Sequence, residues 1–428
     1  MDFSLMHPSD QLVLIMERIY GYGMTTTSGG NLSIKDENGD IWITPGQIDK
    51  GSLRGEDMVC VKPNGDCEGI HKPSIELPFH RAIYNVRPDV KAIVHAHPPA
   101  LVAFSVARTV PDTNILPTAR LICGEVGFAP YALPGSDELG EHIAATFGEG
   151  HNTILLENHA TAAVGASIFE AFMRFETLDF CARLIIGAND LGGTVALGEK
   201  ELALHKGRSH LVEEFSPAYH LSRELALRKE LCKLIHRAYE QRLFTSTEGT
   251  FSVRVNEESF LITPYGIDRK YIKESDLVLI KAGKREKDKI PSRSLQLHQK
   301  IYTRNSSINA VVIAHPPHVM AFAVSHKKFD TLTIPECYLM LRDIPLLQYG
   351  FQFTNPDDLV EMLGERTPVV LVKNDCFISI GDSLLQAFDR LEIAEFSAQS
   401  LIYTNHIGKP VYISKEQKDE LKTSFGIP

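Results

Sequence analysis

The 428-residue sequence predicts an α/β fold in two tandem domains, each with a largely antiparallel sheet covered by helices. Three observations predict it. The chain repeats itself once, the first half opens with an amphipathic helical pattern, and hairpin patterns alternate with further helical segments. Hairpins indicate antiparallel pairing, and the interspersed helices are placed to cover the sheet.

The repeat extends over most of the chain. The segment RIYGYGMTTTSGGNLS at 18–33 corresponds to RAYEQRLFTSTEGTFS at 237–252, and AHPP at 96–99 returns at 314–317. A proline-serine pair precedes a histidine and a tyrosine at equal spacing in both halves (Pro73-Ser74, His80, Tyr84; Pro291-Ser292, His298, Tyr302). This order predicts a tandem duplication with domains at 1–200 and 217–428, joined by a polar segment near 196–217. We call the halves the first and second copies.

In the first copy, Leu12, Ile15, Met16 and Ile19 recur at helical spacing, with Ser9 as the expected N-cap. The segments NLSIKDENGDIWIT and MVCVKPNGDCEGI then read as two hairpins that turn at Asn-Gly dipeptides. A helix after Ser74, the strand KAIVHAH, a helix from about 99, the strand NTILLEN and a helix over 167–187 complete the order. In the second copy, the basic run 281–293 replaces a hairpin turn and is expected to be a solvated loop.

Composition restricts the function classes. Hydrophobic residues make up 43% and charged residues 23% of the sequence, which is typical of a soluble globular protein. The net charge of −10 argues against nucleic acid or an anionic membrane as partner, and no apolar run approaches the ~18 residues of a membrane span. Seven cysteines without CxxC spacing favour free thiols, and the N-terminus lacks a secretory signal, so we expect a cytoplasmic protein.

Histidines and one carboxylate suggest a metal site. His95 and His97 lie two apart on an expected strand, so both side chains face one way, about 6.6–6.8 Å apart along the backbone. Alone, this pair is more typical of core or surface histidines than of a metal site. His159 follows another expected strand, and Glu76 lies in the first turn of a helix, where it could instead complement the helix dipole. Three histidines with one carboxylate would form a zinc-type site with a position for substrate.

The first copy resembles the class II aldolase/adducin family over about residues 1–195. The matching pieces, in order, are Ser28–Ser33, Ile43-Thr44-Pro45, Asp49-Lys50-Gly51, Pro73–Glu76, His80, Tyr84, His95–Pro98, Pro130-Tyr131-Ala132, Asp137-Glu138-Leu139 and Asn158-His159. The resemblance implies a three-layer αβα fold with a mostly antiparallel central sheet. It also implies that His95, His97 and His159 bind a divalent ion, usually zinc, with Glu76 as the acid/base.

That resemblance implies a carbon–carbon lyase acting through a metal-stabilised enediolate. Epimerisation, decarboxylation and dehydration use the same stabilisation, so the site does not choose the reaction. In the family's sugar-phosphate aldolases, donors that match Gly30, Asn31 and Ser74 bind the phosphate. Here, however, Gly46-Gln47 and Ile75 replace further expected donors, so phosphorylated and unphosphorylated carbohydrate substrates both remain open. A non-catalytic, adducin-like scaffold is the alternative from another class.

The second copy departs from the metal-site pattern. Ile313, Asp375 and Ser294 stand where the first copy has His95, His159 and Glu76, so we expect one metal ion per chain. Family members with one domain typically form rings of four, so two tandem chains would close a pseudo-fourfold homodimer.

A tyrosine in the second copy extends this expectation. Family aldolases place a proton-donating tyrosine across the subunit interface, just after an Ile-Pro or Leu-Pro segment. Tyr338 follows Ile334-Pro335, whereas the equivalent first-copy stretch at 116–121 has Arg120 and no tyrosine. We therefore expect Tyr338 to reach a first-copy site as a proton donor, with an ordinary interface aromatic as the alternative.

Overall fold

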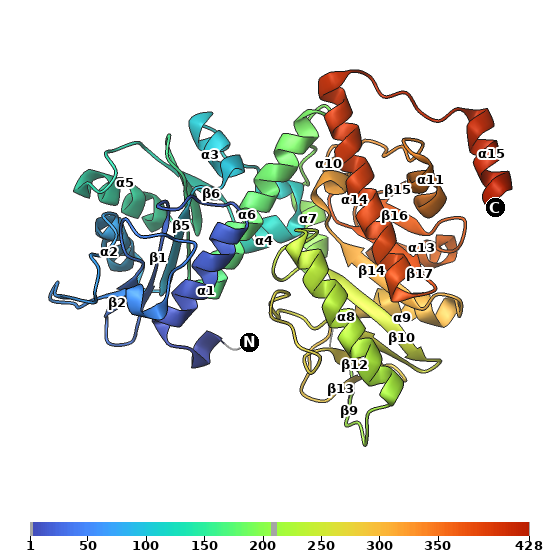
Figure 1. Cartoon of the computed structure of the whole chain (residues 1–428), viewed down its shortest axis with the longest axis horizontal. Helices are drawn as coiled ribbons and strands as arrows, with labels where there is room; N and C mark the ends of the chain where they lie inside the picture. Colours follow the sequence, from blue (N-terminus) through green and yellow to red (C-terminus); the bar gives the residue numbers. More distant parts are fainter. Residues whose placement is uncertain (1–2, 207–211, 428) are drawn as a thin grey trace. The chain divides into compact units, whose positions relative to one another are not determined.

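The computed structural model describes residues 3–206 and 212–427 (Figure 1). By its internal contacts the chain divides into two compact units, 1–114 with 118–183, and 115–117 with 184–428. Each unit contains one mixed sheet with helices packed against it.

The first copy is built on an eight-stranded sheet in the order β4-β3-β2-β1-β5-β8-β7-β6. All neighbours pair antiparallel except β6 and β7, which run parallel. The strands are β1 (Asn31–Lys35), β2 (Ile41–Ile43), β3 (Val59–Val61), β4 (Cys67–Glu68), β5 (Ala92–Ala96), β6 (Val126–Ala129), β7 (Thr153–Leu156) and β8 (Thr161–Gly165). The helices are α1 (Pro8–Gly21), α2 (Leu77–Val86), α3 (Pro99–Val106), α4 (Pro117–Cys123), α5 (Asp137–Gly148) and α6 (Ile168–Asn189).

Helices cover both faces of this sheet, which gives three layers (Figure 1). On one face, Phe79 and Ile83 of α2 pack with Ile143 of α5. On the other, the predicted apolar stripe of α1 packs with Phe172 of α6. The N-cap of α1 lies two residues earlier than expected, because the His7 side chain rather than Ser9 caps the helix and accepts the Ser9 N–H at 3.3 Å; α1 therefore begins at Pro8.

The second compact unit, which includes the segment that links the two copies, repeats this arrangement. Its strands are β9 (Glu214–Phe215), β10 (Thr250–Asn256), β11 (Ser259–Ile262), β12 (Val278–Lys281), β13 (Lys284–Glu286), β14 (Ala310–Ala314), β15 (Leu346–Leu347), β16 (Val369–Val372) and β17 (Phe377–Gly381). Its helices are α7 (Glu199–Lys206), α8 (Ser222–Glu240), α9 (Leu295–Arg304), α10 (Pro317–Val324), α11 (Pro335–Leu341), α12 (Phe351–Thr354), α13 (Pro356–Met362), α14 (Leu384–Ile407) and α15 (Lys415–Phe425).

The two sheets share one topology. The second runs β9-β13-β12-β11-β10-β14-β17-β16-β15, which is the order of the first sheet with β9 added at one edge. Asn31 pairs with His95 in the first sheet, and Thr250 pairs with Ile313 at the same place in the second. The predicted tandem α/β fold with mostly antiparallel sheets is therefore confirmed.

Two segments contain more regular structure than the sequence indicated. The linking segment near 196–217 contains α7 and β9, while its residues 207–211 lie outside the described part. The basic run 281–293 is not a simple solvated loop, because Ala282 and Gly283 form a tight turn that leads into β13. Arg285 on that strand pairs with Glu214 of β9 at 2.6 Å. The domain bounds 1–200 and 217–428 stay predictions.

Candidate metal centre

Sheet register places His95 and its surroundings. His95 lies near the end of β5, directly opposite Asn31, the first residue of β1. His97 follows the last residue of β5, and its backbone N–H donates to the carbonyl of Met24 at 3.1 Å. The bond ties the chain beyond the strand to the loop after α1. The two histidines of the predicted pair are therefore held by the strand and by the segment that leaves it.

His159 comes from the turn between β7 and β8. Asn158 before it has a positive φ of 51°, a conformation that asparagine tolerates better than most residues. The backbone N–H of His159 donates to Ser105 Oγ at 2.9 Å, and this hydroxyl donates to the carbonyl of Leu156 at 2.7 Å. A side chain of α3 thus fixes the turn that presents His159.

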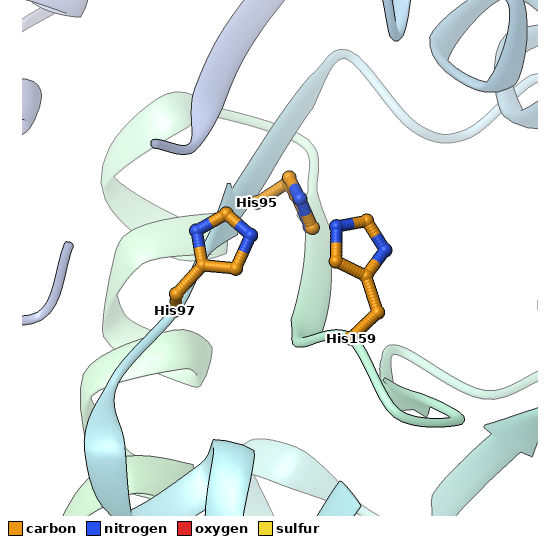
Figure 2. A group of neighbouring side chains, drawn as sticks. All are labelled: His95, His97 and His159. Atoms are coloured by element: carbon orange, nitrogen blue, oxygen red, sulfur yellow. The ribbon is translucent and has the colours of Figure 1, made fainter. Parts of the chain in front are cut away.

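The three histidines form one cluster (Figure 2). Their rings turn toward one another, with centroids 5.0 Å apart for His95 and His97, 5.1 Å for His95 and His159, and 5.3 Å for His97 and His159. One nitrogen from each ring lies within 4.8 Å of the others. This spacing suits three ligands that converge on one ion.

Glu76 lies beside this cluster, immediately before α2. Its Oε2 lies 3.3 Å from His95 Nε2, and its Oε1 lies 3.5 Å from His159 Nε2. Burial alone would raise the pKa of Glu76, but the neighbouring imidazoles and a 2.6 Å hydrogen bond from Asn31 Nδ2 hold this pKa well below its usual value. The carboxylate is therefore ionised at neutral pH.

The histidines present the chemistry that a divalent ion needs. His95 Nδ1 lies 3.0 Å from the carbonyl oxygen of Thr161, so Nδ1 donates to this carbonyl and Nε2 is the nitrogen that faces the cluster. This Nε2 is fully buried and has no hydrogen-bond partner among the described residues. Burial, together with the neighbouring His95, lowers the pKa of His97 to about 3 and that of His159 to about 4, so both are neutral. The three residues fit a divalent ion.

The residues predicted to bind substrate lie around Glu76. Asn31 contacts Glu76 directly, and Gly30 directly precedes Asn31 in the sequence. Ser74 Oγ accepts the backbone N–H of Glu76 at 3.3 Å. Ile75, which replaces an expected donor, has a 67% exposed side chain. The structure thus brings these residues together with the cluster, and their roles toward a substrate stay predictions.

The second copy has a different set of side chains at the equivalent position. Ile313 occupies the sheet position of His95, and Asp375 accepts a hydrogen bond from Gln352. His315 Nε2 has Glu248 Oε2 at 4.0 Å. Within residues 3–206 and 212–427, His95, His97 and His159 form the one group of three potential ligands this close together. The expectation of a single metal ion per chain stays a prediction.

Tyr338, the predicted proton donor, is buried in its own copy. It lies on α11 and is only 2% exposed, with Lys418 Nζ of α15 located 4.7 Å from the ring centroid. Its reach into a first-copy site stays a prediction. Sequence reasoning used His80 and Tyr84 only as landmarks of the repeat and of the family resemblance, whereas the structure shows that His80 contacts Asn31.

The fold and the site define an α/β domain with a candidate three-histidine metal centre. The family model described as the class II aldolase and adducin N-terminal domain matches residues 10–186 and 229–402. The chain therefore belongs to the class II aldolase/adducin family and contains its domain twice.

Individual relatives each resemble slightly less than half of the chain. An L-fuculose phosphate aldolase from Methanococcus maripaludis (strain C7) is 35% identical over 42% of this chain and 93% of its own length. A 3-oxo-tetronate 4-phosphate decarboxylase from Escherichia coli (strain K12) is 29% identical over 44% of this chain and 92% of its own length. A solved structure of an L-fuculose 1-phosphate aldolase has a TM-score of 0.43 and 29% identity, and the match covers 46% of this chain and 93% of that chain.

Among the described helices, none is both long and apolar enough to cross a membrane.

Proposed function

We propose that this chain is a metal-dependent carbon–carbon lyase of the aldolase type. Its substrate is a sugar, a sugar phosphate or a related polyhydroxy carbonyl compound. The observation that carries the proposal is a buried carboxylate beside three converging histidines: Glu76 lies 3.3 Å from His95 and 3.5 Å from His159. The names of the relatives, which include a sugar-phosphate aldolase, support this substrate class.

In this proposal, the histidines, Thr161 and Glu76 each have a separate role. A divalent ion held by His95, His97 and His159, most simply zinc, supplies Lewis-acid stabilisation of negative charge on a substrate oxygen. Thr161 keeps the His95 proton on Nδ1, which leaves Nε2 available as a ligand. Glu76 accepts a proton at its carboxylate from the substrate hydroxyl group on the carbon whose carbon–carbon bond breaks. It then returns this proton to the product.

Decarboxylation is the second candidate. The similarity to a 3-oxo-tetronate 4-phosphate decarboxylase favours it, since the same stabilised carbanion would form when carbon dioxide leaves instead of an aldehyde. An adducin-like scaffold without activity is the less favoured alternative for the first copy, because this copy keeps all four groups of the site.

A substrate screen with a matched variant tests the proposal. Metal-loaded protein is assayed against ketose phosphates, free ketoses and 3-oxo-acid sugar derivatives, with aldehyde and carbon dioxide measured separately. We expect Glu76→Gln to lose about 10²–10⁴ in turnover, the usual contribution of a general acid or base, while elemental analysis still finds one metal ion per chain. Unchanged turnover in this variant would refute the role of Glu76. Two ions per chain would refute the single site.

A further inference from the structure

A series of hydrogen-bonded, buried side chains runs from α2 through β1 to the candidate metal centre. Tyr84 OH lies 2.8 Å from Ser33 Oγ, and Ser33 Oγ lies 2.7 Å from His80 Nδ1. On its other side, His80 Nε2 lies 2.5 Å from Asn31 Oδ1, and Asn31 Nδ2 lies 2.6 Å from Glu76 Oε2. The series therefore links α2 to β1 and returns to the carboxylate that precedes α2.

The amide of Asn31 fixes the direction of the hydrogen bonds. Its nitrogen only donates and lies 2.6 Å from Glu76 Oε2, so its oxygen, which only accepts, faces His80. His80 Nε2 must then carry the proton. Burial lowers the pKa of His80 to about 3, so the ring is neutral, and its Nδ1 accepts from the Ser33 hydroxyl. Ser33 in turn accepts from Tyr84.

The second copy provides a natural comparison. Tyr302, Ser252 and His298 repeat the outer half of the series, with both hydrogen bonds at 2.7 Å. Thr250 stands at the sheet position of Asn31, and Thr250 Oγ1 contacts Ser292 Oγ at 2.7 Å. His298 Nε2 is fully buried and has no hydrogen-bond partner among the described residues.

This comparison separates two roles. The tyrosine, serine and histidine occur in both copies, so they belong to the shared fold. The link from the histidine through an amide to a carboxylate occurs only in the copy that holds the histidine cluster. In the second copy, the Nε2 atom of this histidine is buried without a partner, which costs free energy. The shared fold therefore does not explain the hydrogen bond that the equivalent Nε2 atom makes in the first copy.

From this arrangement we infer that His80 is a positioning residue: through Asn31, it holds the Glu76 carboxylate in its orientation toward the histidine cluster. His80 does not touch the substrate. Its Nε2 proton fixes the amide of Asn31 in one of its two orientations, and only this orientation donates to Glu76. With the amide reversed, its oxygen would face the carboxylate and repel it. The inference rests on the proposed function only for the acid/base role of Glu76.

Two variants at His80 test its two hydrogen bonds separately, because each variant is designed to retain one of them. In His80→Asn, the shorter side chain reproduces the Nδ1 contact with Ser33 but cannot reach Asn31. In His80→Gln, the longer side chain can donate to Asn31 from the Nε2 position. His298→Asn is the matched control in the second copy, since it removes the same ring atoms where no Asn31 equivalent depends on them.

We expect His80→Asn to lower kcat by about 10–100-fold, the range for residues that orient a site from behind it, with KM nearly unchanged. His80→Gln should recover most of this loss, and His298→Asn should keep wild-type kcat. Both Asn variants should lose similar unfolding free energy in urea. Equal kcat in His80→Asn and the wild type, or no recovery in His80→Gln, would overturn the inference.

A readout independent of turnover keeps this test separate from the proposed function. Crystal structures of metal-free wild type and His80→Asn show the Asn31 amide and the Glu76 carboxylate directly. We expect a displaced or reversed amide and a rotated Glu76 in the variant. An unchanged Glu76 would overturn the positioning role even if the lyase activity is confirmed. A rotated Glu76 would support it even if no tested carbohydrate reacts.

Discussion

At the scale of single residues, the site depends on backbone approach as well as on side-chain chemistry. Gly30, expected from the sequence to bind substrate, has a positive φ of 73° and lies against the strand that carries His95. A Cβ at this position would lie 2.8 Å from the carbonyl oxygen of His95 and 3.2 Å from Ala96 Cα. Glycine is therefore required here for packing, whatever it does for a substrate.

We expect Gly30→Ala to destabilise the first copy by about 1–3 kcal/mol and to weaken zinc binding, because β5 must shift. Gly23→Ala is the control: Gly23 also has a positive φ, of 65°, but nothing lies within 4 Å of its added Cβ. Urea unfolding and a zinc titration measure both effects. Equal losses in the two variants would show that the close approach at Gly30 contributes nothing beyond backbone strain.

The four groups of the site were predicted from residue type and spacing. His95 and His97 stood out because an expected strand carries them two apart, and His159 and Glu76 because they lie at element ends. The structure brings them together, although it places His97 just after β5 rather than on it. The signal for His80 was present as well, since a histidine four residues before a tyrosine recurs in both copies, but repetition indicated shared fold rather than a site.

At the scale of elements, both copies bury a neutral histidine on the helix that follows the proline-serine pair. His298 of α9 is fully buried, and burial lowers its pKa to about 3 from an ordinary value near 6.5. Below pH about 6.5, the unfolded chain takes up a proton at this residue and the folded chain does not. The stabilisation is therefore complete above pH 6.5 and is lost as the pH falls toward 3.

We expect the unfolding free energy to fall by up to about 1.4 kcal/mol per pH unit from this residue alone as the pH drops below about 6.5. Urea unfolding between pH 7 and pH 4 measures the slope. His298→Asn removes the titrating group, so its slope should be smaller than that of the wild type. An identical slope in both proteins would show that His298 is not buried in the neutral form.

At the scale of the whole molecule, the duplication preserves topology and loses one set of ligands. The two sheets have the same strand order, yet Ile313 occupies the position of His95. A homodimer that alternates first and second copies in a ring of four would give the second copy a use, by placing Tyr338 at a first-copy site. This assembly stays a prediction, and in the structure Lys418 Nζ lies 4.7 Å from the centroid of the Tyr338 ring.

We expect Tyr338→Phe to lose about 10²–10⁴ in turnover if the phenol donates a proton, with metal content and dimer mass unchanged. Elemental analysis and light scattering provide those two checks. Lys418→Ala should keep or raise turnover, because it removes the group that covers the ring. Full turnover in Tyr338→Phe, or full activity in a monomer, would contradict this arrangement.

The sequence by itself determined the duplication, the hairpins and helices, and the residue types of the candidate centre, because these depend on local periodicity, turn residues and repeated order. The tertiary structure alone decided which groups meet. Asn31 and Glu76 are 45 positions apart, and His95 and Thr161 are 66 apart. Their contacts depend on sheet register and on how α2 packs, which a local pattern does not encode. For the same reason, only the structure shows that His80 faces Asn31 and that α15 covers Tyr338.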